Sequence, residues 1–476
     1  MRFVLSDLIP TREEQEGEGN VRYRMLYESE DKIYTRHIRG VYTRIRKYTG
    51  LPLLAAFFFI PWINIDGRQA VHFDLPERKF NILWATFGPQ DGFLLAWILI
   101  MSAFALFAVT TWLGRVWCGF TCPQTVWTMM FMWAERICQG DRVKRMKLDA
   151  APMSAEKALR KSATYAIWLF IALATALAFV GYFYPIRELV VDLATFNAHP
   201  AGAFWVGFFT LATFFNAGFM REQVCKYMCP YARFQSVMYD QDTLAVYYDA
   251  RRGETRGPRK KGVDYKAEGM GDCIDCYWCV QVCPVDIDIR DGMQYECINC
   301  GLCVDACNSV MDKVGYPRGL IRFTSEDELE TGKTKYLRPR LIGYAIVLSA
   351  MVGLFTQQIL TRSPIEAEVL RDRGARLYRE YRGDIQNVYT VKINNMDQAA
   401  HQFTIRVEGK DGLDYTLRMP RQIYLEAGEI YAVPIRISVP KEQLQDTKHN
   451  IDIIVEALDE KALADRHKTV FIGPKK

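Results

Sequence analysis

The chain has few histidines and lacks the short motifs by which many cofactor sites are recognised in a sequence. It holds six histidines among 476 residues, and none lies in any of the long apolar runs. A membrane b-type haem with two histidine ligands is therefore disfavoured, and the absence of a CxxCH motif argues against an attached c-type haem. No GxGxxG or Walker pattern is present, so the sequence does not support dinucleotide or ATP binding.

The sequence also lacks a recognisable signal peptide and has no cysteine after residue 307. About 47 mainly polar and charged residues precede the first apolar run, unlike the short basic start of a signal peptide, so we expect a retained anchor. All thirteen cysteines lie between Cys118 and Cys307, which favours a reducing cytoplasm around them. The net charge of +5 gives no reason to expect nucleic acid as a partner.

Eight of the thirteen cysteines form two ferredoxin-type runs. In each run three cysteines are separated by two residues, and a fourth follows after three more. The first run is Cys273, Cys276, Cys279 and Cys283, and the second is Cys297, Cys300, Cys303 and Cys307. A cubane cluster needs four thiolates, of which one such loop supplies three and another part of the chain the fourth. The runs therefore predict two [4Fe-4S] clusters and single-electron chemistry.

In two-cluster ferredoxins the last cysteine of each run serves the other cluster. We therefore assign the eight cysteines to two crossed sets, Cys273, Cys276, Cys279 and Cys307 for the first cluster and Cys297, Cys300, Cys303 and Cys283 for the second. Zinc sites and disulfides are the alternatives. Zinc usually binds paired CxxC knuckles rather than triple runs, and disulfides require an oxidising compartment.

Five uncharged apolar stretches are each long enough to cross the hydrocarbon core of a membrane as a helix, which takes roughly 17–25 residues. They are residues 48–65, 93–112, 165–184, 201–219 and 341–360. A spanning helix satisfies every backbone polar group in lipid. We expect five spans, with four or six as alternatives. Pro123 interrupts the further uncharged stretch 116–134, which we interpret as an interfacial or re-entrant segment.

The lysines and arginines near the span ends predict the orientation through the positive-inside rule. These residues are frequent before the first span and between spans two and three, and scarce in the other two short loops. The N-terminus and the cysteine-rich loop between spans four and five are therefore expected in the cytoplasm, and the C-terminal tail outside. Several arginines follow the fifth span and disagree, but long domains translocate largely regardless of charge.

The composition divides the chain into six parts. These are a basic arm at 1–47, a membrane domain at 48–240, a basic linker at 241–263, a ferredoxin-like domain at 264–325, a connector with the fifth span at 326–361 and an outer domain at 362–476. In the outer domain we expect strands at 387–395, 402–408, 415–419, 431–439, 451–457 and 468–472. Their spacing predicts an antiparallel β-sandwich, so the fold class is a multi-domain membrane protein with an α-helical membrane domain, a ferredoxin-like insert and an all-β domain.

Two further cysteine pairs follow spans two and four in one shared pattern, Cys-x3-Cys-Pro. The pairs are Cys118 with Cys122 and Cys225 with Cys229, and an arginine precedes each pair, which indicates a weak internal repeat. Residues i and i+4 share a helix face, so each pair is able to present two sulfurs in one direction. Proline disfavours helix at the residue before it, which predicts a break at each second cysteine.

Two such pairs facing each other would place up to four sulfurs at the membrane edge, near the clusters. These thiols suit soft ions such as Cu(I) and also form reversible disulfides, and the sequence leaves the choice open. Ordinary buried packing is the alternative. Cys138 is interpreted as structural, and the roles of the loop residues His72 and His199 stay open. Nearby methionines that offer thioethers, although packing is their commoner role, are Met129, Met130, Met132, Met220 and Met228.

Taken together, five spans, two Cys-x3-Cys-Pro motifs, a two-cluster insert and a C-terminal sandwich resemble the CcoG/FixG family of bacterial cytochrome c oxidase accessory proteins. The resemblance covers nearly the whole chain, and the sandwich separates this family from related membrane ferredoxins of nitrate and nitrous oxide respiration. One departure is Asn308, which follows Cys307 where the first run has Pro284 after its last cysteine. Because proline does not ligate iron, the departure concerns the loop rather than the ligands.

The resemblance implies a multi-pass protein of the bacterial inner membrane with a periplasmic Ig-like domain. It also implies reduction of Cu(II) to Cu(I) for copper-centre assembly of a cbb3-type oxidase, with transient copper at the catalytic thiols Cys118, Cys122, Cys225 and Cys229. Copper carriers and oxidase assembly factors would be its partners, and a homo-oligomer is compatible with this role. The alternatives are a quinol-linked respiratory electron carrier and a redox sensor without turnover. The electron donor is expected to be another protein or a quinol.

Overall fold

The computed structural model describes residues 8–10, 23–25, 32–65, 67–88, 91–259, 264–361, 365–372, 377–397, 399–409, 411–419, 422–426, 428–459 and 464–474. Much of the predicted basic arm, at 1–7, 11–22 and 26–31, lies outside the described residues, and so do residues 260–263 at the end of the predicted linker. Two short strands of the arm, β1 (Leu8–Pro10) and β2 (Tyr23–Met25), pair antiparallel.

Within the described residues, four helical segments are long and apolar enough to cross a membrane. They are α2 (Gly92–Leu113), α6 (Ala155–Val180), the segment Pro200–Met220 and α14 (Pro339–Leu360). The third segment consists of α8 (Pro200–Phe215) and a π-helical turn, η3 (Asn216–Met220). These four segments correspond to the second to fifth predicted spans.

The first predicted span differs from the structure. Helix α1 (Val41–Phe59) begins in the basic arm and ends six residues before the predicted end of the span, where the 3-10 turn η1 (Ile60–Trp62) follows. Pro61 has no backbone N–H to continue the helical hydrogen bonds. The chain then enters small antiparallel sheets formed by β3 (Asn64–Ile65), β4 (Arg68–Gln69), β5 (Val71–Asp74), β6 (Lys79–Ile82) and β7 (Ala85–Phe87).

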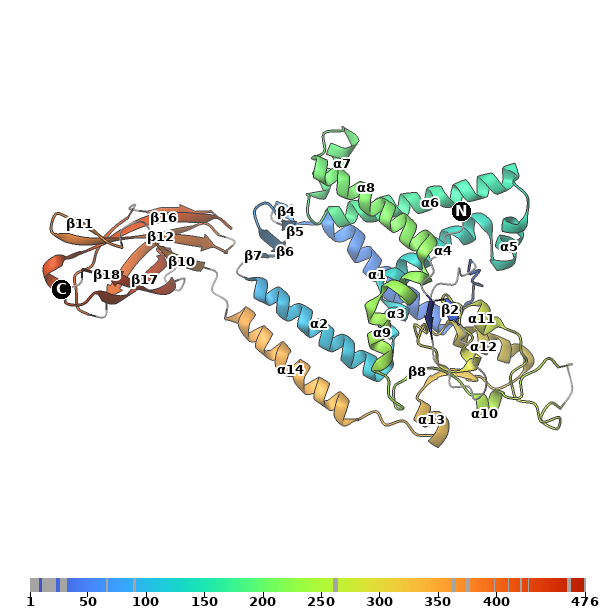
Figure 1. Ribbon diagram of the computed structural model, residues 1–476. Coiled ribbons are helices and arrows are strands. Elements are labelled where there is room, and N and C mark those ends of the chain that lie inside the picture. Colours follow the sequence, from blue (N-terminus) through green and yellow to red (C-terminus); the bar gives the residue numbers. More distant parts are fainter. Residues whose placement is uncertain are drawn as a thin grey trace.

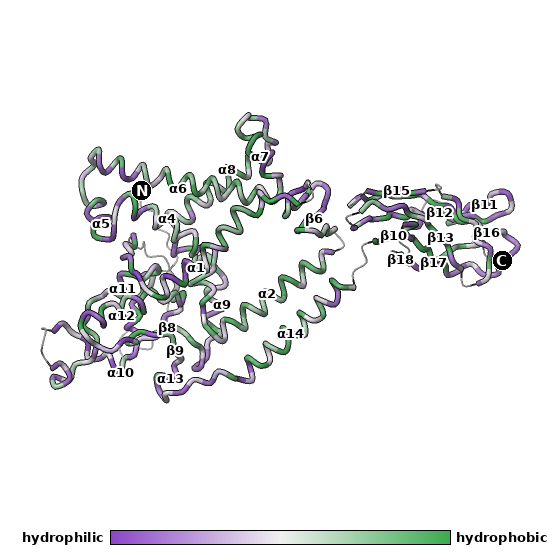
Figure 2. The backbone as a smooth tube through the Cα atoms, turned by 180° about the vertical axis from the view of Figure 1, so that it is seen from behind, coloured by the Kyte–Doolittle hydropathy of each residue, from purple (hydrophilic) through white to green (hydrophobic). Residues whose placement is uncertain are grey.

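The membrane helices pack in two groups (Figure 1). In the first group, α4 (Pro123–Gln139) packs Phe131 against Trp168 of α6, whose indole N–H donates to the Phe131 carbonyl oxygen at 3.0 Å. In the second group, α2 and α14 run side by side, and few of their residues are buried. Figure 2 shows apolar residues along both helices, so these surfaces are suited to contact with lipid.

The cysteine-rich segment forms a small domain at one end of these helices (Figure 1). Strand β8 (Ala245–Tyr248) pairs antiparallel with β9 (Ile321–Thr324), and the short helix α11 (Trp278–Gln281) packs against α12 (Leu302–Val314). The predicted linker at 241–263 therefore differs from the structure, because its β8 belongs to this domain. Val246 and Tyr248 of β8 are buried in the core of the domain, which explains why this basic stretch folds.

The C-terminal part folds as two antiparallel sheets that enclose one core. The first sheet contains β10 (Ile365–Arg371), β12 (Asp384–Asn395), β16 (Ile430–Pro440) and β14 (Thr416–Arg418), with β11 (Arg379–Tyr381) paired to β12. The second contains β15 (Ile423–Leu425), β13 (His401–Gly409), β17 (Lys448–Ala457) and β18 (Ala464–Ile472). All six predicted strands are confirmed, whereas β10, β11 and β15 were not predicted. In Figure 1 the sandwich and the cysteine-rich domain lie at opposite ends of α14.

Candidate functional site

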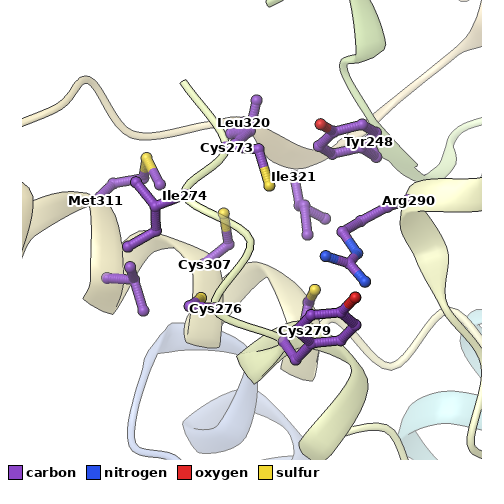
Figure 3. Close-up of a pocket in the computed structure, with 12 residues that line it drawn as sticks. Tyr248, Cys273, Ile274, Cys276, Cys279, Arg290, Cys307, Met311, Leu320 and Ile321 are labelled. Carbon is purple, nitrogen blue, oxygen red and sulfur yellow. The ribbon is translucent and has the colours of Figure 1, made fainter. Parts of the chain in front are cut away.

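Four cysteines from both runs surround one cavity in the cysteine-rich domain. Cys273, Cys276 and Cys279 come from the loop before α11 and from α11 itself, and Cys307 comes from α12. Figure 3 shows their sulfur atoms around a shared space, which Arg290 approaches from the side of Cys279. The space between the lining atoms is about 350 Å³ when its open edge is included, and it is otherwise lined mainly by apolar side chains.

The other four cysteines line a second cavity, whose space is about 360 Å³ when its open edge is included. Cys297, Cys300 and Cys303 belong to the second run, and Cys283 closes the set from the first run. Cys279 lines both cavities, so the two lie next to each other. The structure thus brings together the two crossed sets expected from the spacing, and the role of these thiols as iron ligands stays a prediction.

The backbone of both runs turns in the same way around its cavity. Asp275 and Tyr277 have φ values of 54° and 58°, and the equivalent Asn299 and Gly301 have 51° and 70°. This left-handed region is rare for residues other than glycine, and it curls each loop so that neighbouring cysteines face one space. The loops therefore fit a cubane group with three corners held by one loop.

The chemistry of the lining also fits iron–sulfur clusters. Burial raises the pKa of several of the thiols to about 12, namely Cys279, Cys283, Cys297 and Cys307. A raised pKa opposes loss of the thiol proton when no cation is present, whereas a bound metal deprotonates its thiol ligands. Arg290 also lines the first cavity, and its guanidinium is paired with the carboxylates of Asp275 and Asp288, each at 2.5 Å.

The first Cys-x3-Cys-Pro motif packs directly against the second cavity. Cys118 lies in the short helix α3 (Val116–Phe120), and its side chain contacts the buried group that contains Cys297 and Cys300. A Cβ placed on Gly119 would lie 2.6 Å from the carbonyl oxygen of Ile298, so a larger residue does not fit there without a shift. The membrane-edge motif and the predicted cluster loop are therefore in contact.

Three polar side chains fix this contact. The Arg115 guanidinium donates to the carbonyl oxygen of Tyr295 and, at 3.4 Å, to that of Cys297. From α1, Arg46 Nε donates to the Gly119 carbonyl oxygen at 3.0 Å, and the Thr49 hydroxyl donates to the Phe120 carbonyl oxygen at 3.1 Å. Both arginines are buried; Arg115 links the motif to the cysteine-rich domain, and Arg46 links it to α1.

The predicted break at each second cysteine is confirmed. Cys122 and Cys229 have extended backbones, with ψ values of 129° and 112°, and α4 and α9 (Pro230–Val237) start at the prolines that follow them. The first cysteines differ from one another. Cys118 lies in α3, whereas Cys225 lies in a π-helical turn, η4 (Val224–Met228), closed by the Cys229 N–H and the Val224 carbonyl oxygen. Neither pair therefore shares one α-helical face, because α3 ends at Phe120, before Cys122, and Cys225 lies in a π-helical turn.

The thiols of the two motifs lie near one another. Burial raises the pKa of Cys225 to about 12, and the neighbouring thiols Cys122, Cys118 and Cys229 raise it further. The Cys118 sulfur donates to the Gln235 side-chain oxygen at 3.2 Å, which ties the first motif to the helix after the second. Among the described residues, no three His, Cys, Asp or Glu side chains are already arranged around a single metal position.

A buried ion-pair group that was not predicted from the sequence lies beside the motifs. Glu135 at the end of α4 accepts from Arg145 of α5 (Arg142–Ala150) at 2.8 Å and from Arg221 at 2.7 Å. Glu135 is 1% exposed. The available signal was a single acidic residue at the end of the uncharged stretch 116–134, together with the arginine before the second motif.

Three candidate residues remain, namely Cys138, His72 and His199. Cys138 lies in α4, and its carbonyl oxygen accepts from Arg160 at 3.2 Å. His72 lies on β5, and His199 caps α8 by accepting from the Ala201 N–H at 3.3 Å. These contacts give neither histidine a metal partner in the described part of the chain.

Comparison with known families gives two matches. Residues 220–326 match the model of a "4Fe-4S dicluster domain", and residues 355–474 match the model described as "IG-like fold at C-terminal of FixG, putative oxidoreductase". The first match begins before residue 264, in agreement with the place of β8 in the domain.

Comparison with curated proteins finds relatives over most of the chain. The chain is similar to the nitrogen fixation protein FixG of Rhizobium meliloti, with 35% identity over 477 residues that cover 90% of this chain and 91% of the relative. It is also similar to the proteins RdxB and RdxA of Cereibacter sphaeroides, each at 36% identity. RdxB covers 85% of this chain and is itself covered over 90%, and the corresponding shares for RdxA are 82% and 84%.

Proposed function

The chain belongs to the FixG family of iron–sulfur proteins, and from this premise we propose that it is a membrane oxidoreductase that reduces Cu(II) to Cu(I). The observation that carries the proposal is the contact between the first Cys-x3-Cys-Pro motif and the second cysteine cavity. A redox-active loop in contact with soft metal-binding thiols suits electron delivery to a soft metal ion.

The eight run cysteines would hold two [4Fe-4S] clusters in the crossed sets given above. When bound, such clusters supply one-electron storage and transfer at potentials that depend on their surroundings. Cys118 and Gly119 would provide a packed path from the second cavity to the motif thiols. Arg115 and Arg46 would hold that path in place through their bonds to the Cys297 and Gly119 carbonyl oxygens.

Copper would be the substrate at the motif thiols. One Cu(II) ion takes up one electron and becomes Cu(I), which thiolates bind well because both are soft. Cys118, Cys122, Cys225 and Cys229 supply the four sulfurs, and the extended backbones at Cys122 and Cys229 leave these two thiols free of a regular helix. We propose that copper binding draws the four thiols together and displaces their protons.

The product would serve copper-centre assembly of a cbb3-type oxidase. This part of the proposal rests on the family resemblance, with copper carriers and assembly factors as partners. The cysteine-rich domain would lie in the cytoplasm and the sandwich in the periplasm of the bacterial inner membrane. The distribution of lysine and arginine among the short loops supports this orientation.

The test is an anaerobic electron-transfer measurement on the purified, cluster-replete protein. The protein is reduced with dithionite, the excess is removed, and Cu(II) is added together with a chelator that traps Cu(I). The visible absorbance of the iron–sulfur centres and the Cu(I) complex are recorded together. We expect the bleached absorbance to return at the rate at which Cu(I) forms.

Two variants locate the site. Replacing Cys118, Cys122, Cys225 and Cys229 together by serine is expected to slow Cu(I) formation by about tenfold or more. The matched control is Cys138→Ser, which removes a membrane-edge thiol outside both motifs and is expected to retain the rate. Equal rates for both variants would exclude the motif thiols, and a bleached absorbance that persists in Cu(II) would exclude copper as acceptor.

A further inference from the structure

A large pocket lies where the basic start of α1 gives way to its apolar part. Its volume is about 1430 Å³, including the open mouth. One wall is apolar and consists of α1 and α4 side chains, namely Leu51, Leu54, Met129, Met130, Met132 and Trp133. Leu51 and Trp133 are 56% and 49% exposed, so this wall continues onto the apolar surface of the helices. We call this space the boundary pocket.

A second part of the lining of the boundary pocket is polar. Arg36 and His37 come from the segment before α1, Lys47 from α1 and Arg136 from α4. Asp141 accepts from the His37 backbone N–H at 3.3 Å. A ligand that fits both walls has a polar head with hydrogen-bond acceptors and a long apolar tail.

The floor of the boundary pocket reaches the second cysteine cavity. Val282 and Pro284 line the pocket, and they are the two neighbours of Cys283 in the chain. Leu302 also lines it, and Leu302 precedes Cys303. Pro284 and Leu302 line the second cysteine cavity as well, so they separate the two spaces.

We propose that the boundary pocket binds a membrane quinol, which is the electron donor of this protein. The inference deepens the function proposed above and rests on it for the acceptor. The shared walls decide between a quinol and an anionic phospholipid, since both have a polar head and an apolar tail. A lipid head group gains nothing from contact with residues that border a cluster cavity, whereas a redox-active ring needs that contact.

The proton and electron balance can be met by the described residues. Oxidation of one quinol breaks its two O–H bonds and gives one quinone, two protons and two electrons. Burial and the nearby Arg136 lower the pKa of His37 below its ordinary value of 6.5, so the neutral ring accepts one proton. The second proton leaves directly to solvent at the open mouth of the pocket.

The number of cysteine cavities matches the number of electrons that one quinol donates. A quinol gives two electrons, whereas each Cu(II) ion accepts one, so a two-electron donor needs two one-electron stores. Because Cys279 lines both cavities, the second electron has a short route to the first cavity. The boundary pocket and the first Cys-x3-Cys-Pro motif both contact the second cavity, at different faces. The quinol would therefore deliver electrons at one face of this cavity, and copper would receive them at the other.

The test measures binding and reduction separately on the full, cluster-replete chain in detergent. Binding uses the quinol analogue 2-heptyl-4-hydroxyquinoline N-oxide, whose fluorescence is quenched when it binds a protein. Reduction uses duroquinol under anaerobic conditions, with the iron–sulfur absorbance as the readout. We expect the analogue to bind the wild-type protein and to compete with duroquinol.

Two substitutions on α1 form a matched pair. Leu51→Trp places a bulky side chain in the boundary pocket, whereas Leu53→Trp changes an exposed α1 residue that does not line it. We expect Leu51→Trp to weaken binding of the analogue by about tenfold. The same variant should lose reduction by duroquinol and keep reduction by dithionite, and Leu53→Trp should retain all three properties.

Equal binding by the two tryptophan variants would overturn the inference. Displacement of the analogue by phosphatidylglycerol micelles but not by duroquinol would also overturn it, because the pocket would then be a lipid site. The two proposals fail separately. Loss of copper reduction by the dithionite-reduced protein removes the proposed function, while quinol binding at the boundary pocket is measured without copper.

Discussion

Gly119 lies against the backbone of Cys300. A Cβ placed on Gly119 would lie 2.9 Å from the Cα of Cys300 and 3.0 Å from its backbone nitrogen. Real Cβ atoms do not approach backbone this closely, so the membrane-edge motif meets the cysteine loop at a distance that only glycine permits. The residue next to Cys118 thus sets how near the motif lies to the second cavity.

Gly119→Ala is therefore expected to push α3 away from the cysteine loop. The clash is with backbone rather than with a flexible side chain, so relief requires a shift, and overpacking of this kind costs about 1–3 kcal/mol. We expect slower Cu(I) formation with both iron–sulfur centres retained, as measured by the copper assay and by iron content. Gly207→Ala in α8 is the control, because a Cβ there meets nothing within 4 Å. A Gly119→Ala protein with the wild-type rate would contradict the proposed path.

The last cysteine of each run is expected to serve the cavity of the other run. Cys283 lines the second cavity and Cys307 the first. Cys283→Ser should therefore alter the same electron paramagnetic resonance signal as Cys297→Ser, and Cys307→Ser the same signal as Cys273→Ser. Each variant should lose about half of the iron.

Copper assays on the Cys283→Ser and Cys307→Ser proteins test which of the two cavities passes electrons to copper. The first Cys-x3-Cys-Pro motif contacts the second cavity, so Cys283→Ser should slow Cu(II) reduction more than Cys307→Ser does. A signal that pairs Cys283 with Cys273 instead would show that the runs are not crossed.

The sequence predicted those features that depend on residues close together in the chain. Cysteine spacing predicted which thiols share a cavity, because the two-residue gaps fix how one loop wraps around a group. Proline after Cys122 and Cys229 predicted the breaks there, since proline acts on its own neighbour. Alternation predicted the longer sandwich strands, because each buries one face.

The sequence was silent where distant segments meet. The contact of Gly119 with Ile298 and Cys300 joins two domains and has no local pattern. The boundary pocket is also formed by segments that are distant in the sequence, because its walls come from α1, α4 and the cysteine loops. Strand β8 was assigned to the linker because basic residues follow it from Arg251 and because its three buried positions, Ala245, Val246 and Tyr248, do not alternate.

The Glu135 ion-pair group is expected to hold α4, α5 and the second motif together. Burial opposes the charge of Glu135, but Arg221, Lys32 and Arg145 outweigh it and hold its pKa below the ordinary 4.5. A lowered pKa gives stability that is present above pH 4.5 and is lost as the pH falls through the folded value. At pH 7, Glu135→Gln should therefore cost about 3–5 kcal/mol, since it leaves buried arginines without their carboxylate.

Thermal unfolding in detergent measures this cost. The matched control is Glu156→Gln, which breaks the exposed pair with Arg160, and its expected effect is below about 1 kcal/mol. Equal unfolding temperatures for the two variants would show that the buried group contributes nothing to stability.

The sandwich is expected to lose stability as the pH rises through the titration of His401. Its ring nitrogens lie 2.8 Å from an Asp397 oxygen and 2.9 Å from an Asp459 oxygen. Burial lowers the pKa of His401, but the two carboxylates outweigh burial and raise it above the ordinary 6.5. A raised pKa gives stability that is complete below pH 6.5 and is lost as the pH rises through the folded value. Hydrogen exchange in β13, corrected for intrinsic rates, should accelerate over that range. His401→Gln should remove this dependence, whereas the control His467→Gln on β18 should keep it; a dependence that persists without His401 would assign it to another group.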